Sequence, residues 1–251
     1  MLRRLRDLEN WTIAGADDET DVGSVEDSYF DDQRWTVRYV VVNAGGWLVD
    51  NSVLISPMAV RLVEWEKSKI HVTLSREHVQ NAPKLQPHAP VTRGYEADYS
   101  RYYGYPYYWV GTGLWGINPE PPVMAAPGAE PLPAGVEGEP DTTHLRSAKE
   151  VSGYHIHALD GEIGHVEDFL FDGTTWTIRY LVIDTSNWIG GRTVLVSPDW
   201  VRRVDWNSRE IHVDMSREAV KGSPEYNPTI ELSREYEDRL HGHYRRPAYW
   251  K

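Results

Sequence analysis

The 251-residue chain contains eleven Trp and fifteen Tyr, which supply enough bulky apolar surface for one large domain or two smaller ones. It contains no Cys, which excludes disulfides and thiolate metal sites, and no segment approaches the ~20 apolar residues that cross a bilayer. The net charge of −12 is distributed so that neither half is strongly basic, which argues against general nucleic-acid binding.

The first residues, MLRRLRDLENW, carry positive charges without the apolar stretch of a secretory signal, so we expect a cytoplasmic protein with no transmembrane segment. An acidic cluster follows at Asp17, Asp18, Glu19 and Asp21. Its spacing does not match an EF-hand, because the glycine comes late and the closing glutamate is misplaced. We interpret it as the solvated tip of a hairpin.

The clearest strand is WTVRYVVV, residues 35–42. Polar and apolar residues alternate as far as Tyr39 and then give way to three valines. A strand with one wet face keeps alternating, so its second half is expected to be covered on both faces. A loop with Trp47 near its tip leads to the strand VLISP. The run RLVEWEKSKIHVTL then indicates two strands joined by a turn at residues 66–69.

Two short helices are predicted after these strands. Ser75 has the position of an N-cap, and TRGYEADYSRYY indicates a second helix that ends near the proline of the aromatic tail YPYYW. Residues 110–143 then contain thirteen Pro or Gly residues, together with five acidic side chains and no basic one. This composition is typical of an extended linker. Trp115 is the one aromatic residue in it, and is the candidate anchor of the linker on the preceding module.

The second half of the chain repeats the first. A shift of 141 positions aligns residues 23–109 with 164–250 without a gap, and 36 of these 87 positions are identical. The strand WTIRYLVI, residues 176–183, is the copy of WTVRYVVV, and a tight hairpin is expected around Asp160 and Gly161. The duplication predicts a mainly β fold of two tandem small β-barrel modules, each with short C-terminal helices. The expected modules are residues 1–109 and 144–251, joined by the acidic linker 110–143.

The run GSVEDSYFDDQRWTVRYVVV…VLISP and its second copy resemble the PRC-barrel domain, and the tails YE…YYGYPYYW and YEDRLHGHYRRPAYW resemble its stand-alone bacterial members. That domain also occurs in the cytoplasmic part of the reaction-centre H subunit of purple photosynthetic bacteria and in ribosome-maturation factors. The resemblance implies a module that docks against a membrane complex, a ribosomal particle or another protein, with no shared catalytic residues. This chain lacks the membrane helix of the H subunit and the RNA-handling domain of the ribosome factors.

Recurring carboxylates are the first candidates for chemistry. The pairs Glu26-Asp27 and Glu167-Asp168 occupy equivalent positions, but adjacent residues of a strand point to opposite faces and cannot converge on one substrate. We therefore favour a structural or binding role for them. No phosphate loop, nucleophile elbow or convergent acid–base set is present. We expect neither enzymatic activity nor a cofactor.

Histidines are the second candidates. His155 and His157 alternate along one strand and would share a face as possible metal ligands, whereas the first module has Thr12 and Ala14 at these positions. We expect no metal site, although the sequence leaves this pair open.

The candidate binding residues are aromatic residues of loops and tails together with a recurring arginine: Trp47, Trp188, Arg38, Arg179, Tyr105, Tyr108, Trp109, Tyr249 and Trp250. Two interpretations stand side by side. Either each tail covers its own module and each arginine pairs with a carboxylate inside it, or these residues form a contact surface for the other module or a partner.

We predict a non-catalytic protein-binding or scaffolding protein whose partner is a protein of unknown identity. The alternatives are an accessory factor of a photosynthetic reaction centre or other membrane complex, and a ribosome-associated maturation factor. We also expect the two modules to pair as an intramolecular pseudo-dimer that buries Trp47 and Trp188.

Overall fold

The computed structural model describes residues 1–17, 20–48, 52–85, 90–124, 143–185 and 191–251. Contacts between these residues divide the chain into two compact units. The N-terminal unit consists of Asp7–Ser147 and Thr174–Thr177, and the C-terminal unit consists of Met1–Arg6, Ala148–Gly173 and Ile178–Lys251. Each unit therefore includes a short segment of the other repeat. The predicted boundaries at residues 109 and 144 do not include this exchange of segments.

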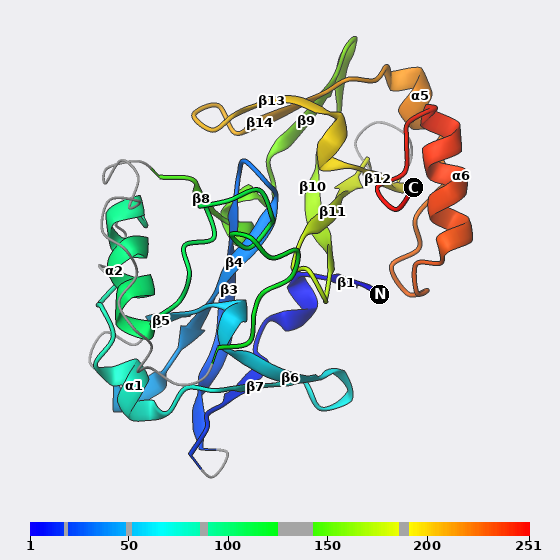
Figure 1. Ribbon diagram of the computed structural model, residues 1–251. Helices are drawn as coiled ribbons and strands as arrows, with labels where there is room; N and C mark the ends of the chain where they lie inside the picture. Colours follow the sequence, from blue (N-terminus) through cyan, green and yellow to red (C-terminus); the bar gives the residue numbers. More distant parts are fainter. Residues whose placement is uncertain (18–19, 49–51, 86–89, 125–142, 186–190) are drawn as a thin grey trace. The chain divides into compact units, whose positions relative to one another are not determined.

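The N-terminal unit is built on one seven-stranded sheet in the order β5-β4-β3-β2-β7-β6, with β8 paired to β3 (Figure 1). Its strands are β2 (Thr12–Ala14), β3 (Asp21–Asp31), β4 (Thr36–Asn43), β5 (Ser52–Ile55), β6 (Val60–Glu64), β7 (Lys69–Val72) and β8 (Leu145–Ser147). The pairs are antiparallel except for β2 and β7, which are parallel.

The C-terminal unit repeats this sheet in the order β12-β11-β10-β9-β14-β13, with β1 paired to β10. Its strands are β1 (Leu2–Arg4), β9 (His155–Ala158), β10 (Gly161–Asp172), β11 (Ile178–Asp184), β12 (Thr193–Val196), β13 (Val201–Asp205) and β14 (Glu210–Val213). A two-residue connection between β9 and β10 confirms the hairpin expected around Asp160.

The predicted mainly β architecture with two equivalent modules is confirmed, but closure of each sheet into a barrel is not observed. Among the described residues, each strand order ends at two strands that are not hydrogen-bonded to each other. A single 3₁₀ turn joins them, η3 (Pro57–Ala59) in one unit and η5 (Pro198–Trp200) in the other. Ser56 and Ser197 cap these turns, and the following proline is pre-set for the first helical position.

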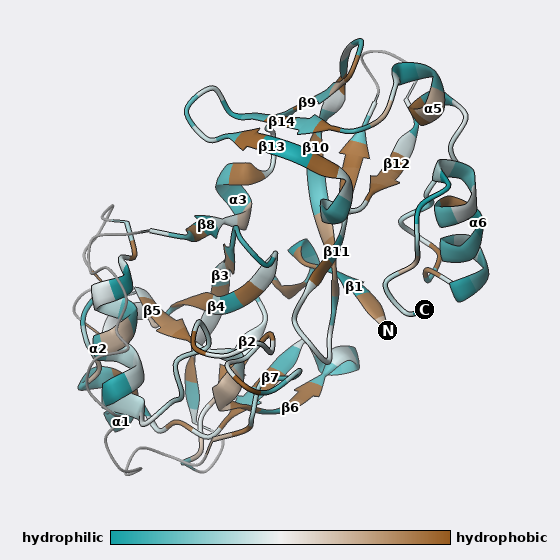
Figure 2. Ribbon diagram, turned by 45° about the horizontal axis from the view of Figure 1, so that its top comes forward, coloured by the Kyte–Doolittle hydropathy of each residue, from teal (hydrophilic) through white to brown (hydrophobic). Residues whose placement is uncertain are grey.

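The centre of the N-terminal unit is β4. All its residues from Thr36 to Val42 are buried, which confirms the prediction of a strand covered on both faces. Helix α2 (Arg93–Tyr103) supplies part of the cover, because the ring of Tyr99 packs edge-on against Tyr39 with centroids 5.1 Å apart. In Figure 2, brown hydrophobic segments lie along β5, β11 and β12, whereas α6 (Arg234–Tyr244) is mostly teal.

The short helices begin where the sequence predicts. Ser75 caps α1 (Arg76–Gln80) and Ser216 caps α5 (Arg217–Lys221), each by accepting a hydrogen bond from a backbone N–H of the first turn. Thr92 and Ser233 do the same for α2 and α6. The one further α-helix among the described residues is α3 (Ala148–Val151).

None of the helices in the described part of the chain is long and apolar enough to span a bilayer. The longest, α2 and α6, have 11 residues each and are therefore about 17 Å long, little more than half of a hydrocarbon core.

Strand β3 explains why each sheet takes a strand from the other repeat. One side of β3 pairs with β4, while its other side pairs with β2 near its start and with β8 near its end, at residues 29–31. Without β8, the end of β3 would expose unpaired backbone N–H and C=O groups. Strand β1 completes β10 in the same way, with Leu2 opposite Asp172.

The recurring aspartates hold these exchanged strands in place. Asp168 accepts a hydrogen bond from Arg4 Nε at 2.8 Å and another from the Arg6 backbone N–H at 3.2 Å. Its equivalent Asp27 accepts one from the Ser147 hydroxyl at 2.5 Å. Asp168 is only 2% exposed, so these bonds are formed away from water, where an unpaired carboxylate would be costly. This placement gives the aspartates of both predicted pairs a structural role.

The exchange generates a prediction for isolated modules. A fragment of residues 144–251 retains strand Leu145–Ser147 but has no β3 for it to join, and its own β10 lacks the strand Leu2–Arg4. We expect two such fragments to exchange these strands and form a homodimer, because strand exchange is a low-cost route to dimers. Analytical ultracentrifugation measures this as a doubling of mass.

The matched control is a fragment of residues 148–251, which lacks the exchanged strand and should stay monomeric. A folded monomer of fragment 144–251 at high concentration would mean that the strand folds back onto its own β10, contrary to this prediction.

Candidate functional site

A β-bulge in each sheet turns one arginine toward the interior. In the β3–β4 ladder, Tyr29 pairs with Tyr39 and Phe30 pairs with Val37, so Arg38 is left without an opposite residue. Because a bulge breaks the alternation of side chains, Arg38 and both its neighbours are buried. The β10–β11 ladder has the same irregularity at Arg179.

Arg38 contacts both a carboxylate and an aromatic ring. Its side chain is 0% exposed, and its Nη2 lies 3.0 Å from Asp31 Oδ2. The guanidinium carbon lies 3.9 Å from the ring centroid of Tyr108, which is the geometry of a cation–π contact. This pairing confirms the expectation that Arg38 meets a recurring carboxylate inside its own module.

Glu96 is the second centre of the cluster. The N-cap of α2 fixes the first turn of the helix, and Arg93 and Glu96 form an ion pair at 2.9 Å across it. The carboxylate also accepts hydrogen bonds from the hydroxyls of Tyr108, at 2.7 Å, and Tyr39, at 3.3 Å. The tail, the helix and the central strand therefore meet at one carboxylate.

Burial is the largest influence on the pKa of Glu96. It raises the pKa of Glu96 to about 7, although the charge of Arg93 and the hydrogen bond from Tyr108 act in the opposite direction. Burial also raises the pKa of Tyr108 well above its usual value. Near neutral pH, the phenol of Tyr108 is therefore protonated and donates a hydrogen bond, whereas the carboxyl group of Glu96 is present in both its protonated and its ionised form.

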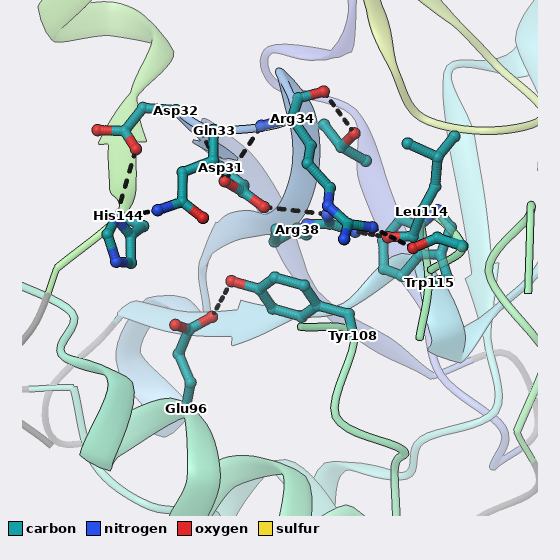
Figure 3. A network of polar contacts seen from close by, with 12 residues as sticks. Asp31, Asp32, Gln33, Arg34, Arg38, Glu96, Tyr108, Leu114, Trp115 and His144 are labelled. Atoms are coloured by element: carbon teal, nitrogen blue, oxygen red, sulfur yellow. Dashed lines mark hydrogen bonds and ion pairs between the residues drawn. The ribbon is translucent and has the colours of Figure 1, made fainter. Parts of the chain in front are cut away.

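The beginning of the linker covers this cluster. Within the cover segment, which we define as residues 110–118, the Leu114 carbonyl accepts a hydrogen bond from Arg38 Nη1 at 2.7 Å (Figure 3). The Trp115 ring lies on the guanidinium with 4.8 Å between carbon and centroid, and its indole N–H donates to the Thr175 carbonyl at 2.9 Å. Trp115 is completely buried, which confirms it as the anchor of the linker.

Glycines allow the cover segment to fold this tightly. A Cβ on Gly113 would lie 2.5 Å from the Asn118 carbonyl oxygen, so no other residue fits this conformation. Arg34 donates hydrogen bonds to the carbonyls of Gly111 and Gly113. The run GTGLWG is thus a compact peptide held by two arginines.

The C-terminal unit contains the same cluster. Glu237 accepts hydrogen bonds from Tyr249 at 2.9 Å and Tyr180 at 3.0 Å, and pairs with Arg234 at 3.0 Å. Arg179 stacks on Tyr249 at 4.2 Å. Six cluster positions correspond across the 141-residue repeat: Asp31 and Asp172, Arg38 and Arg179, Tyr39 and Tyr180, Arg93 and Arg234, Glu96 and Glu237, Tyr108 and Tyr249.

The two clusters differ in burial. Arg179 is 21% exposed and lies 3.8 Å from Asp172, whereas Arg38 is fully enclosed. Arg234 is 52% exposed against 7% for Arg93.

A histidine distinguishes the second cluster further. His241 replaces Ser100 of the first repeat, and its two ring nitrogens lie 2.9 Å from the Tyr180 hydroxyl and 2.9 Å from the Pro247 carbonyl. Burial lowers the pKa of His241, so its neutral form is favoured. When Nδ1 of His241 donates to the Pro247 carbonyl, Nε2 is free of a proton and can accept a hydrogen bond from the Tyr180 hydroxyl. Glu237 accepts from the same hydroxyl.

The aromatic candidates lie in different environments. Tyr105 is 1% exposed and stacks on Tyr103, so it belongs to the core and offers no surface to a partner. Trp109 is half-buried beneath Arg93, and Trp250 beneath Arg234, at 4.2 and 4.0 Å.

The contacts found for Trp47 are to its own unit. Its indole N–H donates to the Val22 carbonyl at 3.1 Å, and the Arg76 guanidinium lies over its ring at 5.1 Å. Trp188 lies outside the described residues.

Sequence reasoning identified the arginines and tyrosines of the bulge and tail but missed Glu96, Arg93 and their second copies. The available signal was the repeat itself, because the pattern R-x-Y-E recurs at 93–96 and 234–237. A carboxylate and an arginine one helical turn apart are typical of a surface ion pair, and only the fold places them under the tail.

The histidine pair predicted to share a face is on β9. His155 lies 2.9 Å from Glu162, and His157 stacks on His212 at 5.1 Å. In the part of the chain that the structure describes, no three His, Asp or Glu side chains are grouped so that they could hold a metal ion.

Comparison with known proteins gives one family. The model of the PRC-barrel domain matches residues 2–79 and 147–220. The search of curated proteins returned no match. The matched segments include the bulged arginines and end before α2 and α6, so Glu96, Tyr108 and their equivalents lie outside them.

The raised pKa of Glu96 predicts a pH dependence of stability. The folded protein binds this proton more tightly than the unfolded chain, so the stabilisation is complete below about pH 4.5 and is lost as the pH rises through about 7. The loss is on the order of 3 kcal/mol. Thermal unfolding at pH 5 and pH 8 should therefore differ less in Glu96→Gln than in the wild type. An unchanged difference in Glu96→Gln contradicts the prediction.

The two arginines should differ in their contribution to stability. Replacing Arg38 with Gln leaves the buried carboxylate of Asp31 unpaired, and should lower the unfolding free energy by about 3 kcal/mol. Arg179→Gln removes a longer, partly exposed pair and should cost less than ~1 kcal/mol. Urea unfolding of both variants tests this, and equal losses would show that the burial difference does not matter.

Proposed function

Because the chain belongs to the PRC-barrel domain family and carries that domain twice, we propose that it is a non-catalytic scaffolding protein that binds a protein partner. The observation that carries this proposal is the cluster built around Arg38. In it, a guanidinium group holds a peptide segment by one backbone carbonyl and one indole ring. These are contacts of peptide recognition, in which a charged donor fixes the backbone and an aromatic residue supplies the buried area.

The protonation of the cluster also supports a binding role. Burial raises the pKa of Tyr249 to about 12 and raises that of Tyr108 well above its usual value, so both phenols stay protonated at neutral pH. Each carboxylate of the cluster is engaged by an arginine and two phenols. Groups that satisfy one another in this way rigidify the structure around them, which supports a binding role over a catalytic one.

The position of the cluster within the chain adds a third argument. Its bulged arginine and aspartate belong to the family-matched segments, whereas the helix and aromatic tail follow them. In this chain each family-matched segment is therefore followed by an aromatic layer that packs onto it. Such a layer changes what a scaffold recognises while the sheet beneath it stays the same.

The proposal predicts a stoichiometric complex. The tagged full-length chain, purified from its native host, should retain one protein partner, identified by mass spectrometry. The purified partner should then bind the purified chain saturably in isothermal titration. Identification also decides among a membrane complex, a ribosomal particle and a soluble assembly. Recovery of the chain without any partner that rebinds after purification would contradict the proposed function.

A further inference from the structure

We propose that a cavity in the C-terminal unit binds a phosphate group, either as the free ion or as part of a small phosphate monoester. The cavity has a volume of about 380 Å³ and is lined by Arg192, by residues 222–225 and by one face of α6. This volume falls within the range of about 300–1,000 Å³ that small-molecule sites occupy. The site is distinct from the cluster of Arg179, and binding of phosphate there is independent of the proposed partner.

Helix α6 supplies two of the basic groups. Tyr236, Arg239 and His243 are spaced i, i+3 and i+7, so their side chains lie on one side of the helix, and all three line the cavity. Arg239 is exposed, and its guanidinium lies 5.9 Å from the ring centroid of Tyr236. Within the described part of the chain no carboxylate pairs with Arg239, so its N–H groups remain available to a ligand.

Arg192 is the third basic group, and it is held in a fixed position. Its Nη1 donates to the Lys221 carbonyl at 2.7 Å, and its Nη2 donates to the Ser223 carbonyl at 2.9 Å. Each of these nitrogens carries a second hydrogen, so two donors of the guanidinium remain. The carbonyls orient the group without neutralising it. Glu225 lies 3.6 Å from Nε but is 61% exposed, so water screens its charge.

His243 is positioned by the neighbouring helix α5, which lies beside α6 (Figure 1). Its Nε2 lies 2.7 Å from the Ala219 carbonyl, and a carbonyl only accepts, so Nε2 carries a proton. The other ring nitrogen, Nδ1, becomes a second donor when the ring takes up a proton. Gly222 leaves room for this ring, because a Cβ there would lie 3.2 Å from His243 Cε1.

The first repeat keeps the packing but not the basic groups. Its residues at the positions of Arg192, Arg239 and His243 are Asn51, Asp98 and Tyr102. Tyr102 donates to the His78 carbonyl at 2.8 Å, as His243 does to Ala219, so tyrosine satisfies the same structural contact. Lys84 at the position of Glu225 is the one change of opposite sign. Helix packing therefore does not require the basic residues of the second repeat.

The segment that follows Trp109 in the first repeat does not reach the equivalent place. Its described residues, 110–124, form hydrogen bonds with Arg34, Arg38, Met58 and Thr73. The corresponding positions of the second repeat are Thr175, Arg179, Asp199 and Asp214. None of these four residues lines the cavity, so its opening does not depend on a segment of that kind.

The arrangement of the basic groups favours phosphate among anions. A carboxylate presents two oxygens, whereas a phosphate group presents three or four and can accept from several donors at once. The planar guanidinium groups of Arg192 and Arg239 match phosphate oxygens in pairs. Tyr236 and Pro224 line the same cavity and supply apolar surface for the organic part of a monoester.

Calorimetric titration of the full-length protein with inorganic phosphate and with phenyl phosphate tests the proposal. Ionic strength is held constant with sodium chloride, so that general screening does not change. Two charge-assisted hydrogen bonds correspond to a dissociation constant of about 1 mM or below. We expect Arg239→Asp to weaken binding at least about tenfold, because it replaces a donor with a repelling carboxylate. His243→Tyr should weaken binding by a smaller factor.

Both substitutions introduce the residue of the first repeat, where the same helix pair is folded, so they should preserve the structure. Arg192 is left unchanged because it also holds the connection after α5. Arg203→Gln is the control: it removes an arginine on β13 that is 61% exposed and does not line the cavity, and it should leave binding unchanged. Circular dichroism establishes that each variant is folded.

The absence of binding of both compounds at about 10 mM, or equal affinity in wild type and Arg239→Asp, overturns the inference. Acetate that binds as tightly as phosphate at the same ionic strength also overturns it, because the site would then recognise negative charge without selecting phosphate. Tighter binding of phenyl phosphate than of phosphate supports a monoester as the ligand, and equal affinities support the free ion.

Discussion

The buried guanidinium of Arg38 determines what the rest of the N-terminal unit must provide. A positive charge with no access to water is costly unless an opposite charge lies close to it and its faces are packed. Asp31 supplies the opposite charge, Tyr108 and Trp115 supply the faces, and Leu114 supplies a carbonyl. The aromatic tail and the first part of the linker are therefore held in place by an arginine in the middle of a strand.

The bulge is what makes this dependence possible. In a regular strand, Arg38 would alternate with its buried neighbours and point away from them. The residue skipped in the β3–β4 pairing breaks that alternation, so that Tyr39 contacts Glu96 of α2 while the adjacent Arg38 contacts Tyr108 of the tail. Because the C-terminal unit has the same irregularity at Arg179, the cluster is a property of the module and not of one copy.

The two copies place the same cluster in different surroundings. In the first copy the cluster is filled by the chain's own cover segment and contributes to the core. In the second copy the same side chains are partly exposed, and a histidine has joined the hydrogen-bonded network. Meanwhile the exchange of β1 and β8 links the copies topologically, because each sheet is completed by a strand from the other repeat.

By itself, the sequence determined the features that depend on local pattern and on the repeat. These include the mainly β fold, the module duplicated at 141 residues, the covered strand at 36–42, the serine caps, and Trp115 as the anchor of the linker. Hydrophobic periodicity and capping involve residues close together in the chain, so the pattern carries the information. The tertiary structure alone decided that residues 2–4 complete the sheet of the second repeat, that Arg38 is the bulged residue, and that Glu96 lies beneath the tail. Strand exchange and bulges are choices between backbone pairings of similar local energy. The choice depends on which residues pair with the backbone groups at the strand edge and with the buried charge. Those residues are distant in the sequence from the strands that they complete.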